Sequence, residues 1–400
     1  MQTRRGHGLQ VVSAKGSPPP NIVRLSVDPE RPIPLRKAEG FIWREGAIPP
    51  GFAWYAMLGT EAVREHAVLP DGAAAIFLPA EFDHIGDGDL IRVFPERGNI
   101  TVLFQHAARH HSFLLTERCN NYCLMCSQPP RDVNDGWIFD DLMTAIPLID
   151  PETPEIGFTG GEPTLLGERL VRLIRQCESY LPRTGLHVLT NGRAFASDAF
   201  TRMFAGVGHH DLMFGIPIYS DLSHVHDYVV QADGAFDETV RGVLNLKRYG
   251  LKVEIRVVVH KQTYERLPEL ARFLTRNLTF VDQIVFMGLE MTGFTKANLE
   301  DLWIDPLDYQ PQLVEAVRHV AASRIHVSVY NHQLCITDRS LWPYARQSIS
   351  DWKNEYMPEC EGCAVRSQCA GFFSSAKLRY SAHIRALATG EAGPMPVQAL

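Results

Sequence analysis

The sequence is marked by what it does not contain: it has no run of basic residues, no internal repeat and no low-complexity tract. None of its apolar stretches is long enough to span a bilayer. These absences argue against nucleic-acid partners and against a membrane protein. The segment Met1–Val12 carries Arg4 and Arg5 without an apolar core after them, so we expect no signal peptide and a cytoplasmic location.

Cysteine is also scarce, but its eight residues are clustered. Three lie between positions 119 and 126 and three between positions 360 and 369, while Cys177 and Cys335 stand apart. With 45% hydrophobic and 21% charged residues, a chain of 400 residues can build a core without disulfides. In a reducing compartment, clustered cysteines indicate metal ligands or reactive thiols. Cys177 falls on the apolar face of a predicted helix, so we expect it to pack.

Residues 1–110 predict a β-rich N-terminal region, because short apolar runs are separated there by Pro, Gly and Asp. The runs are Asn21–Val27, Gly51–Leu58, Ala73–Leu78 and Leu90–Phe94. The region contains no chemical motif, and both a structural and a substrate-docking role remain open.

Residues 111–326 alternate between strand-like and helical patterns, which predicts a parallel α/β sheet or barrel. The expected strands are Phe113–Thr116, Glu155–Phe158, Leu186–Leu189, Leu212–Ile218, Val253–Val259 and Gln283–Met287. The expected helices are Asp140–Leu148, Leu166–Tyr180, Asp198–Phe204, Phe236–Tyr249, Arg266–Leu278 and Pro311–Ala322. The active site of such a fold forms after the carboxyl ends of the strands.

The remainder of the chain shows no clear alternation of strand and helix. We expect residues 327–376 to form a cysteine-bearing domain. Residues 377–400 contain Gly, Pro and Ala toward the end and predict a loose tail from about Leu387.

The first cysteine group, Cys119, Cys123 and Cys126, directly follows the first predicted barrel strand. A [4Fe–4S] cluster usually takes four protein thiolates, so three would leave one iron open, as in a catalytic metal site. A disulfide would leave an odd cysteine. A zinc site would need a fourth ligand, which His110 or His111 could supply.

The second predicted strand ends in Phe158-Thr-Gly-Gly-Glu-Pro163. Gly160 and Gly161 let the backbone approach a ligand without interference from a Cβ atom, and the Glu162 carboxylate can accept hydrogen bonds from an ammonium group. A plain strand-to-helix turn is the alternative interpretation.

The second cysteine group combines Cys360, Cys363 and Cys369 with Cys335, 25 residues earlier. Four thiolates suffice to close an iron–sulfur site. A four-cysteine zinc knuckle fits the same residues, so both alternatives remain open.

The pattern Cys119-Asn-Asn-Tyr-Cys123-Leu-Met-Cys126, with Gly160-Gly161-Glu162-Pro163 one unit later, resembles the radical SAM superfamily. The resemblance implies a partial (β/α)6 TIM-type barrel within an α/β fold. It also implies a [4Fe–4S] cluster that binds S-adenosylmethionine through its open iron and cleaves it to a 5′-deoxyadenosyl radical. A reductant such as flavodoxin or ferredoxin would supply the electron. Met125 stands where the superfamily usually has an aromatic residue.

Further cofactor contacts follow from the same resemblance. The Gly160–Pro163 element would contact the methionine amino group and Ser220 the ribose. Arg256 would meet the methionine carboxylate, or form a structural salt bridge. Gly288 would support the adenine. Asn191, in a Thr-Asn-Gly sequence after the third strand, belongs to a binding element or a simple turn. For His226 and Asp227 we expect a local hydrogen bond.

The cysteines after the barrel resemble the twitch or SPASM extension of peptide-modifying members, which holds auxiliary [4Fe–4S] clusters. Within that superfamily, the chain resembles the radical SAM maturase, the C component, of the His-Xaa-Ser peptide system. The segments that carry this similarity are Leu115–Cys119, Cys123–Pro130, Phe158–Thr164 and Cys369–Phe373. It implies a precursor peptide with His-Xaa-Ser repeats as the substrate. The alternatives are a radical SAM enzyme with a small-molecule substrate and a non-catalytic iron–sulfur or zinc protein.

Overall fold

The computed structural model describes residues 5–6, 9–12, 19–59, 66–347 and 355–392. The chain divides into two compact units. The first comprises Met1–Phe113, Gly136–Ile156 and Leu173–Thr184, and the second comprises Leu114–Asp135, Gly157–Arg172 and Gly185–Leu400.

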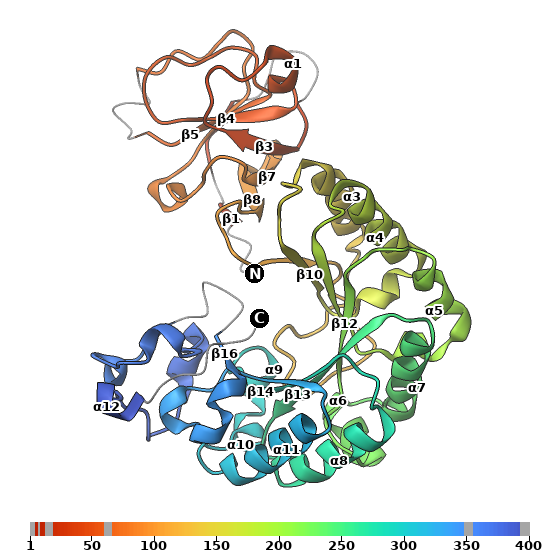
Figure 1. Cartoon of the computed structure of the whole chain (residues 1–400). Coiled ribbons are helices and arrows are strands. Elements are labelled where there is room, and N and C mark those ends of the chain that lie inside the picture. Colours follow the sequence, from red (N-terminus) through yellow and green to blue (C-terminus); the bar gives the residue numbers. More distant parts are fainter. Residues whose placement is uncertain (1–4, 7–8, 13–18, 60–65, 348–354, 393–400) are drawn as a thin grey trace. The chain divides into compact units, whose positions relative to one another are not determined.

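The first unit contains an eight-stranded sheet in the order β1-β8-β7-β3-β4-β5-β6-β2 (Figure 1). Its strands are β1 (Arg5–Gly6), β2 (Val11–Val12), β3 (Ile22–Ser26), β4 (Glu39–Trp43), β5 (Trp54–Met57), β6 (Ala75–Phe77), β7 (Leu90–Phe94) and β8 (Asn99–Phe104). The short helix α1 (Ile33–Arg36) joins β3 to β4, and these two strands are parallel. Trp54 and Ile76 lie in one apolar cluster, and Phe41 and Tyr55 lie in another. The predicted β-rich region is confirmed, with β1, β2, β4 and β8 as additional strands.

The second sheet has the order β16-β15-β14-β13-β12-β11-β10-β9, so that its strands follow one another in space as in the sequence. These strands are β9 (His111–Leu114), β10 (Glu155–Thr159), β11 (Gly185–Leu189), β12 (Leu212–Pro217), β13 (Lys252–Val259), β14 (Gln283–Gly288), β15 (His326–Tyr330) and β16 (Ala345–Arg346). The pairs from β11 to β16 are parallel. The α/β fold with a curled parallel sheet is therefore the one expected from the sequence.

Helices connect most of these strands, as βαβ units require. They are α3 (Gly136–Ala145), α4 (Glu168–Tyr180), α5 (Asp198–Ala205), α6 (Ser223–Val230), α7 (Ala235–Arg248), α8 (Leu267–Asn277), α9 (Phe294–Ala297), α10 (Leu299–Leu302) and α11 (Gln310–Ala322). In β13, the buried Val253, Ile255 and Val257 alternate with Glu254 and Arg256, which form an ion pair. One face of that strand is thus apolar and the other carries charge.

Two parts of this architecture differ from the expectation. The parallel sheet continues beyond Val327, because β15 pairs with β14 and β16 pairs with β15. The prediction missed β15, whose buried Val327 and Val329 alternate with polar residues over five positions only. It also missed α6, whose histidines and β-branched residues have low helix propensity.

The described part of the expected tail is packed. Ile384 and Leu387 are buried in two apolar clusters that also contain the C-terminal cysteines. A short helix, α12 (Thr389–Ala392), follows them, and Arg385 forms an ion pair with Glu391. Residues 393–400 lie outside the described part of the chain.

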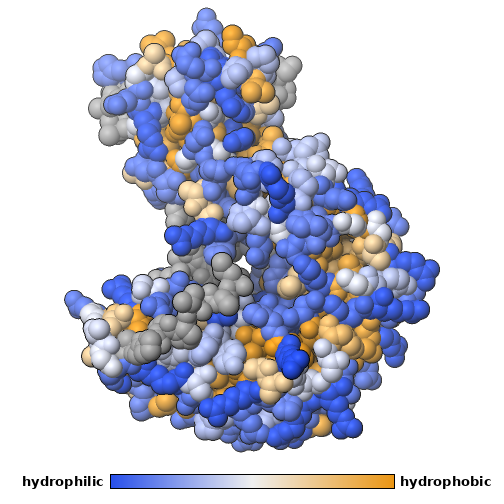
Figure 2. Space-filling model, viewed as in Figure 1, coloured by the Kyte–Doolittle hydropathy of each residue, from blue (hydrophilic) through white to orange (hydrophobic). Residues whose placement is uncertain are grey.

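Within the described ranges, no helix combines the length and apolar character needed to cross a bilayer. Figure 2 shows hydrophilic residues spread among apolar ones over the visible face of the molecule.

Candidate functional site

The loop after β9 brings Cys119, Cys123 and Cys126 close enough to interact electrostatically. Burial raises the pKa of Cys119 to about 11 and that of Cys123 to about 12, and it also raises the pKa of Cys126. Their mutual repulsion adds to this effect at Cys119 and Cys123. Three half-buried thiols this close together ionise jointly only if a positive charge compensates them, which is what a bound metal group supplies.

Backbone hydrogen bonds fix this loop to α6. The amides of Tyr122 and Leu124 donate to the carbonyl oxygens of Val230 and Val229, at 3.0 and 2.9 Å. Since α6 ends at Val230, the cysteine loop lies against the carboxyl end of that helix.

The segment after β14 holds the other side of the loop. The Phe294 amide donates to the Cys126 carbonyl oxygen at 2.9 Å, and the Asn298 side chain donates to the Leu124 carbonyl oxygen at 2.9 Å. Gly293 has a φ of +52°, and a Cβ atom there would collide with the Cys126 carbonyl oxygen. The close approach therefore requires glycine at this position.

The Gly160-Gly161-Glu162 element lies directly against the segment that leads into Cys119. The amides of Gly161 and Glu162 donate to the carbonyl oxygens of Thr116 and Arg118, both at 2.8 Å. A Cβ atom at Gly160 or Gly161 would collide with these same oxygens. The predicted reason for the two glycines was approach to a ligand. In the structure, they permit approach to the cysteine loop.

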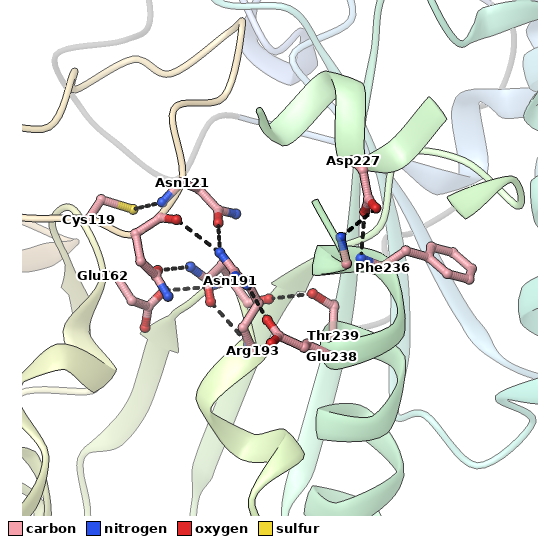
Figure 3. A network of polar contacts seen from close by, with 12 residues as sticks. Cys119, Asn121, Glu162, Asn191, Arg193, Asp227, Phe236, Glu238 and Thr239 are labelled. Carbon is pink, nitrogen blue, oxygen red and sulfur yellow. Dashed lines mark hydrogen bonds and ion pairs between the residues drawn. The ribbon is translucent and has the colours of Figure 1, made fainter. Parts of the chain in front are cut away.

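The Glu162 carboxylate is buried and accepts hydrogen bonds from within the chain (Figure 3). Its Oε1 accepts from the Thr164 amide at 2.9 Å and from the Thr164 and Thr190 hydroxyls at 2.6 Å, and its Oε2 accepts from the Asn191 amide at 2.7 Å. Burial raises the pKa of Glu162, and these donors act in the opposite direction. Pro163 follows as the first residue of a short 3₁₀ helix. The role of Glu162 toward an ammonium group stays a prediction.

Asn191 links the third strand to the cysteine loop. Its Nδ2 donates to Asn120 Oδ1 at 2.6 Å, and its carbonyl oxygen accepts from the Thr239 hydroxyl at 3.0 Å. The sequence left a binding element and a simple turn as alternatives, and the structure brings Asn191 beside the predicted cluster ligands.

Arg193 is a residue of this site that the sequence did not indicate. Its Nη1 donates to the Asn120 carbonyl oxygen at 2.9 Å and to Asn121 Oδ1 at 2.6 Å. Its Nε donates to Glu238 Oε2 at 2.6 Å, in the first turn of α7. Figure 3 shows Arg193 between the cysteine loop and that helix. Only its place after Thr190-Asn191-Gly192 could have drawn attention to it.

The remaining predicted contacts lie at or near the carboxyl ends of β12 to β14. Ser220 is buried, and its Oγ accepts from the Leu222 amide at 3.1 Å. Arg256 forms the ion pair with Glu254, which is the structural alternative left open by the sequence. Gly288 closely approaches the backbone of Asn331, and a side chain there would collide with it. Contacts of these residues with a cofactor stay predictions.

His226 and Asp227 hold local structure. The Nδ1 atom of the buried His226 lies 3.2 Å from the Tyr219 amide, which donates to it. Asp227 accepts from the amides of Gly234 and Phe236, both at 2.8 Å, where α7 begins. Both residues form local hydrogen bonds, as predicted, and each accepts them from backbone amides.

The four C-terminal cysteines line one small pocket. Cys335 comes from the segment after β15, and it meets Cys360, Cys363 and Cys369 there. Burial raises the pKa of Cys335, Cys360 and Cys369, the last to about 11. The Leu387 amide points at the Cys363 sulfur from 3.4 Å. A chain that brings four thiols and a backbone N–H donor together can surround an iron–sulfur cluster.

Among the residues that the structure describes, no three His, Cys, Asp or Glu side chains converge closely enough to share a single metal ion. A [4Fe–4S] cluster makes a different demand, because each thiolate binds a different iron and the sulfurs surround a cage. The donor sets of both sites, all thiol and partly buried, fit such a cluster.

Comparison with known proteins gives a match over the central part of the chain. The family model described as "Radical SAM superfamily" matches residues 113–274. The Fe-coproporphyrin III synthase of Methanosarcina barkeri is 26% identical over 201 residues, which are 48% of this chain and 47% of that protein. The tungsten-containing aldehyde ferredoxin oxidoreductase cofactor-modifying protein of Pyrococcus furiosus is 28% identical, over 61% of this chain and 68% of that protein.

Among solved structures, Streptococcus suis SuiB bound to S-adenosylmethionine is similar with a TM-score of 0.49 and 15% identity, over 71% of this chain and 77% of that chain. The chain spans about half the length of the first of the curated relatives that it matches.

Proposed function

We propose that this protein is an enzyme that cleaves S-adenosylmethionine reductively, because residues 113–274 match the family model of the radical SAM superfamily, whose members bind a [4Fe–4S] cluster and S-adenosylmethionine. Cys119, Cys123 and Cys126 would hold the cluster. A cluster bound by three thiolates supplies an open iron and the electron for the cleavage.

One observation carries this proposal: the three thiols and the Gly160-Gly161-Glu162 element are parts of one backbone-bonded unit. The 2.8 Å hydrogen bonds from the amides of Gly161 and Glu162 to the carbonyl oxygens of Thr116 and Arg118 fix the segment that leads into the cysteine loop. A protein that only carried electrons would need no such element beside its cluster. Glu162, Asn191 and Ser220 would then bind and orient S-adenosylmethionine at the carboxyl ends of the strands.

For the second site, we propose an auxiliary iron–sulfur cluster held by Cys335, Cys360, Cys363 and Cys369. The shared pocket and the Leu387 amide that faces Cys363 support this assignment. The domain boundary after residue 110 belongs to the same proposal, whereas β15 and β16 carry the sheet past residue 326, and Ile384 and Leu387 pack with the cysteines beyond residue 376.

The proposed substrate is a ribosomally made peptide, as in the His-Xaa-Ser system that the sequence resembles. A cavity supports this assignment, because it is lined by residues at the ends of β13, β14 and β15 and by the segment that follows Cys369. Its walls include Val259, Gly288, Leu289, Trp303, Asn331 and Phe372. A substrate there would lie between the two cysteine sites.

A small-molecule substrate is the second candidate. One relative is named Fe-coproporphyrin III synthase, so similarity to this chain is also found in a protein named for a small-molecule product.

The first test is anaerobic reconstitution with iron and sulfide, reduction with dithionite and incubation with S-adenosylmethionine. We expect a brown protein that releases 5′-deoxyadenosine. A reconstituted, reduced protein that leaves S-adenosylmethionine intact would refute the proposed activity.

The second test separates the substrates. The reduced enzyme is incubated with a His-Xaa-Ser repeat peptide, and the peptide mass is followed. Loss of two hydrogens or a crosslink supports the peptide. An unchanged peptide beside consumption of a small metabolite favours the second candidate.

A further inference from the structure

We propose that Arg193 is a positioning residue that sets the reduction potential of the cluster at Cys119, Cys123 and Cys126. It would act by holding Asn121 so that its N–H donates to the Cys119 sulfur, and by placing its own positive charge beside the cysteine loop. The inference rests on the proposed function and assigns a role to a residue outside the ligand set.

Asn121 is buried in the loop between the first two cysteines. Its backbone N–H donates to the Cys119 sulfur at 3.4 Å. Its side-chain oxygen accepts a hydrogen bond from Arg193 Nη1 at 2.6 Å. Asn121 therefore links a predicted cluster ligand to the guanidinium group.

Arg193 anchors the Asn121 side chain. A guanidinium group only donates hydrogen bonds, so the atom 2.6 Å from Nη1 must be the amide oxygen. Because the same Nη1 atom also donates to the Asn120 carbonyl oxygen, Arg193 holds the two residues that follow Cys119. Without Arg193 this part of the loop loses its anchor, and the Asn121 N–H is no longer held against the Cys119 sulfur.

The position of Arg193 is fixed from three directions. Nη1 also bonds the Asn120 carbonyl oxygen, Nε bonds Glu238, and the Arg193 amide donates to Asn191 Oδ1 at 3.0 Å. The Arg193 side chain is 16% exposed, and its ion-pair partner Glu238 is 46% exposed. The guanidinium charge therefore lies on the partly buried side of this pair, toward the cysteine loop.

Hydrogen bonds to the sulfurs and nearby charge are two of the properties that set iron–sulfur potentials. Reduction adds one electron, supplied in the test by dithionite, and so increases the negative charge on the cluster. Donors and a cation stabilise the reduced form, and their removal must lower the potential. A residue that only held the loop together would change cluster occupancy without this shift.

The experiment is an EPR-monitored redox titration of the reconstituted holoprotein, with the barrel cluster identified by the change in its signal when S-adenosylmethionine is added. In Arg193→Gln, we expect the ratio of reduced to oxidised barrel cluster at a fixed potential to fall about tenfold. For one electron this equals about 59 mV. Asn121→Ala should shift the potential in the same direction. The double variant should shift it by less than the sum, because Arg193 acts through Asn121.

Arg202→Gln is the matched control. It removes the same charge from α5, where Arg202 pairs with Asp198 away from the cysteine loop, and should leave the potential unchanged. Arg193→Lys keeps the charge but cannot reproduce the guanidinium geometry, so an intermediate shift is expected. If Arg193→Gln fails to take up iron, Arg193→Lys and Asn121→Ala decide the question.

A potential in these variants equal to that of the unaltered protein, or an equal shift in Arg202→Gln, overturns the inference while the proposed function stands. If the unaltered protein forms no cluster that cleaves S-adenosylmethionine, the proposed function fails, and this inference fails with it.

Discussion

The two cysteine sites of the second unit are built in different ways. At the first, three cysteines share one loop, and polar residues from the neighbouring strands and helices hold that loop. At the second, four cysteines come from two segments and lie in apolar clusters with Leu334, Trp342 and Leu387. With a [4Fe–4S] cluster bound as proposed, the first arrangement would leave a coordination position for a substrate, and the second would surround its metal group completely. The difference would then be one between a reactive site and an electron-accepting or structural one.

Removal of the first ligand set should have the largest effect. In the triple variant with Cys119, Cys123 and Cys126 changed to Ala, 5′-deoxyadenosine formation should fall to the level without protein. About half of the iron should remain, held by the second site. Product is followed by chromatography and metal by elemental analysis. A triple variant that still forms 5′-deoxyadenosine at the normal rate would show that the first site is not the reactive one.

Removal of the second ligand set should leave cofactor cleavage intact. In Cys360→Ala/Cys363→Ala, we expect 5′-deoxyadenosine to form while peptide modification is lost, because the substrate radical has no electron acceptor. Iron should again fall by about half, with little zinc in the unaltered protein. Stoichiometric zinc in the triple variant described above would instead assign the second site as a zinc knuckle.

A pair of glycine variants should show that the backbone is packed more tightly at the first site than at the second. Gly161→Ala places a methyl group against the Arg118 carbonyl oxygen and should cost about 2–3 kcal/mol of stability. Gly362→Ala, between two cysteines of the second site, meets no atom within 4 Å. It should cost about 1 kcal/mol, from its φ of +72°.

Denaturant unfolding measures both costs. Gly86→Ala is the neutral control, since nothing lies within 4 Å of its Cβ position either. Equal losses in Gly161→Ala and Gly362→Ala would contradict the close backbone contact at the first site.

The smallest predicted effect is a loss of folding stability at acidic pH. Burial lowers the pKa of His260 to about 3, and neither ring nitrogen has a hydrogen-bond partner within the described part of the chain. This histidine neighbours the Tyr219 ring, near the first site. Because the unfolded chain binds its proton near pH 6.5, the folded state should lose about 1.4 kcal/mol between pH 7.5 and pH 5.5.

His260→Phe should abolish that part of the acid sensitivity, since phenylalanine cannot take up a proton. The measurement is the free energy of unfolding at the two pH values. His224→Phe, at an exposed position of α6, should leave the acid sensitivity unchanged. An unaltered pH slope in His260→Phe would show that this residue does not contribute.

The sequence predicted the parts of this molecule that depend on local pattern. The strands up to β14 are marked by apolar residues in short or alternating runs. The spacing of the cysteines is a property of the sequence itself and does not depend on how the chain folds. It did not predict Arg193, whose partners Asn120 and Asn121 lie 73 and 72 residues away. Nor did it predict that Glu162 would accept four hydrogen bonds from within the protein. Such pairings depend on the order of the strands in the sheet and on how deeply each residue is buried, and neither can be read from a single sequence.

Gln333 has a consequence for catalysis beyond its own hydrogen bond. It lines both the cavity at the ends of β13–β15 and the pocket of the C-terminal cysteines, and its side chain donates to the Gly371 carbonyl oxygen at 2.8 Å. The two spaces therefore share this side chain as part of their walls. Under the proposed function, an electron that passes from a substrate in the cavity to the second site would have Gln333 beside its path.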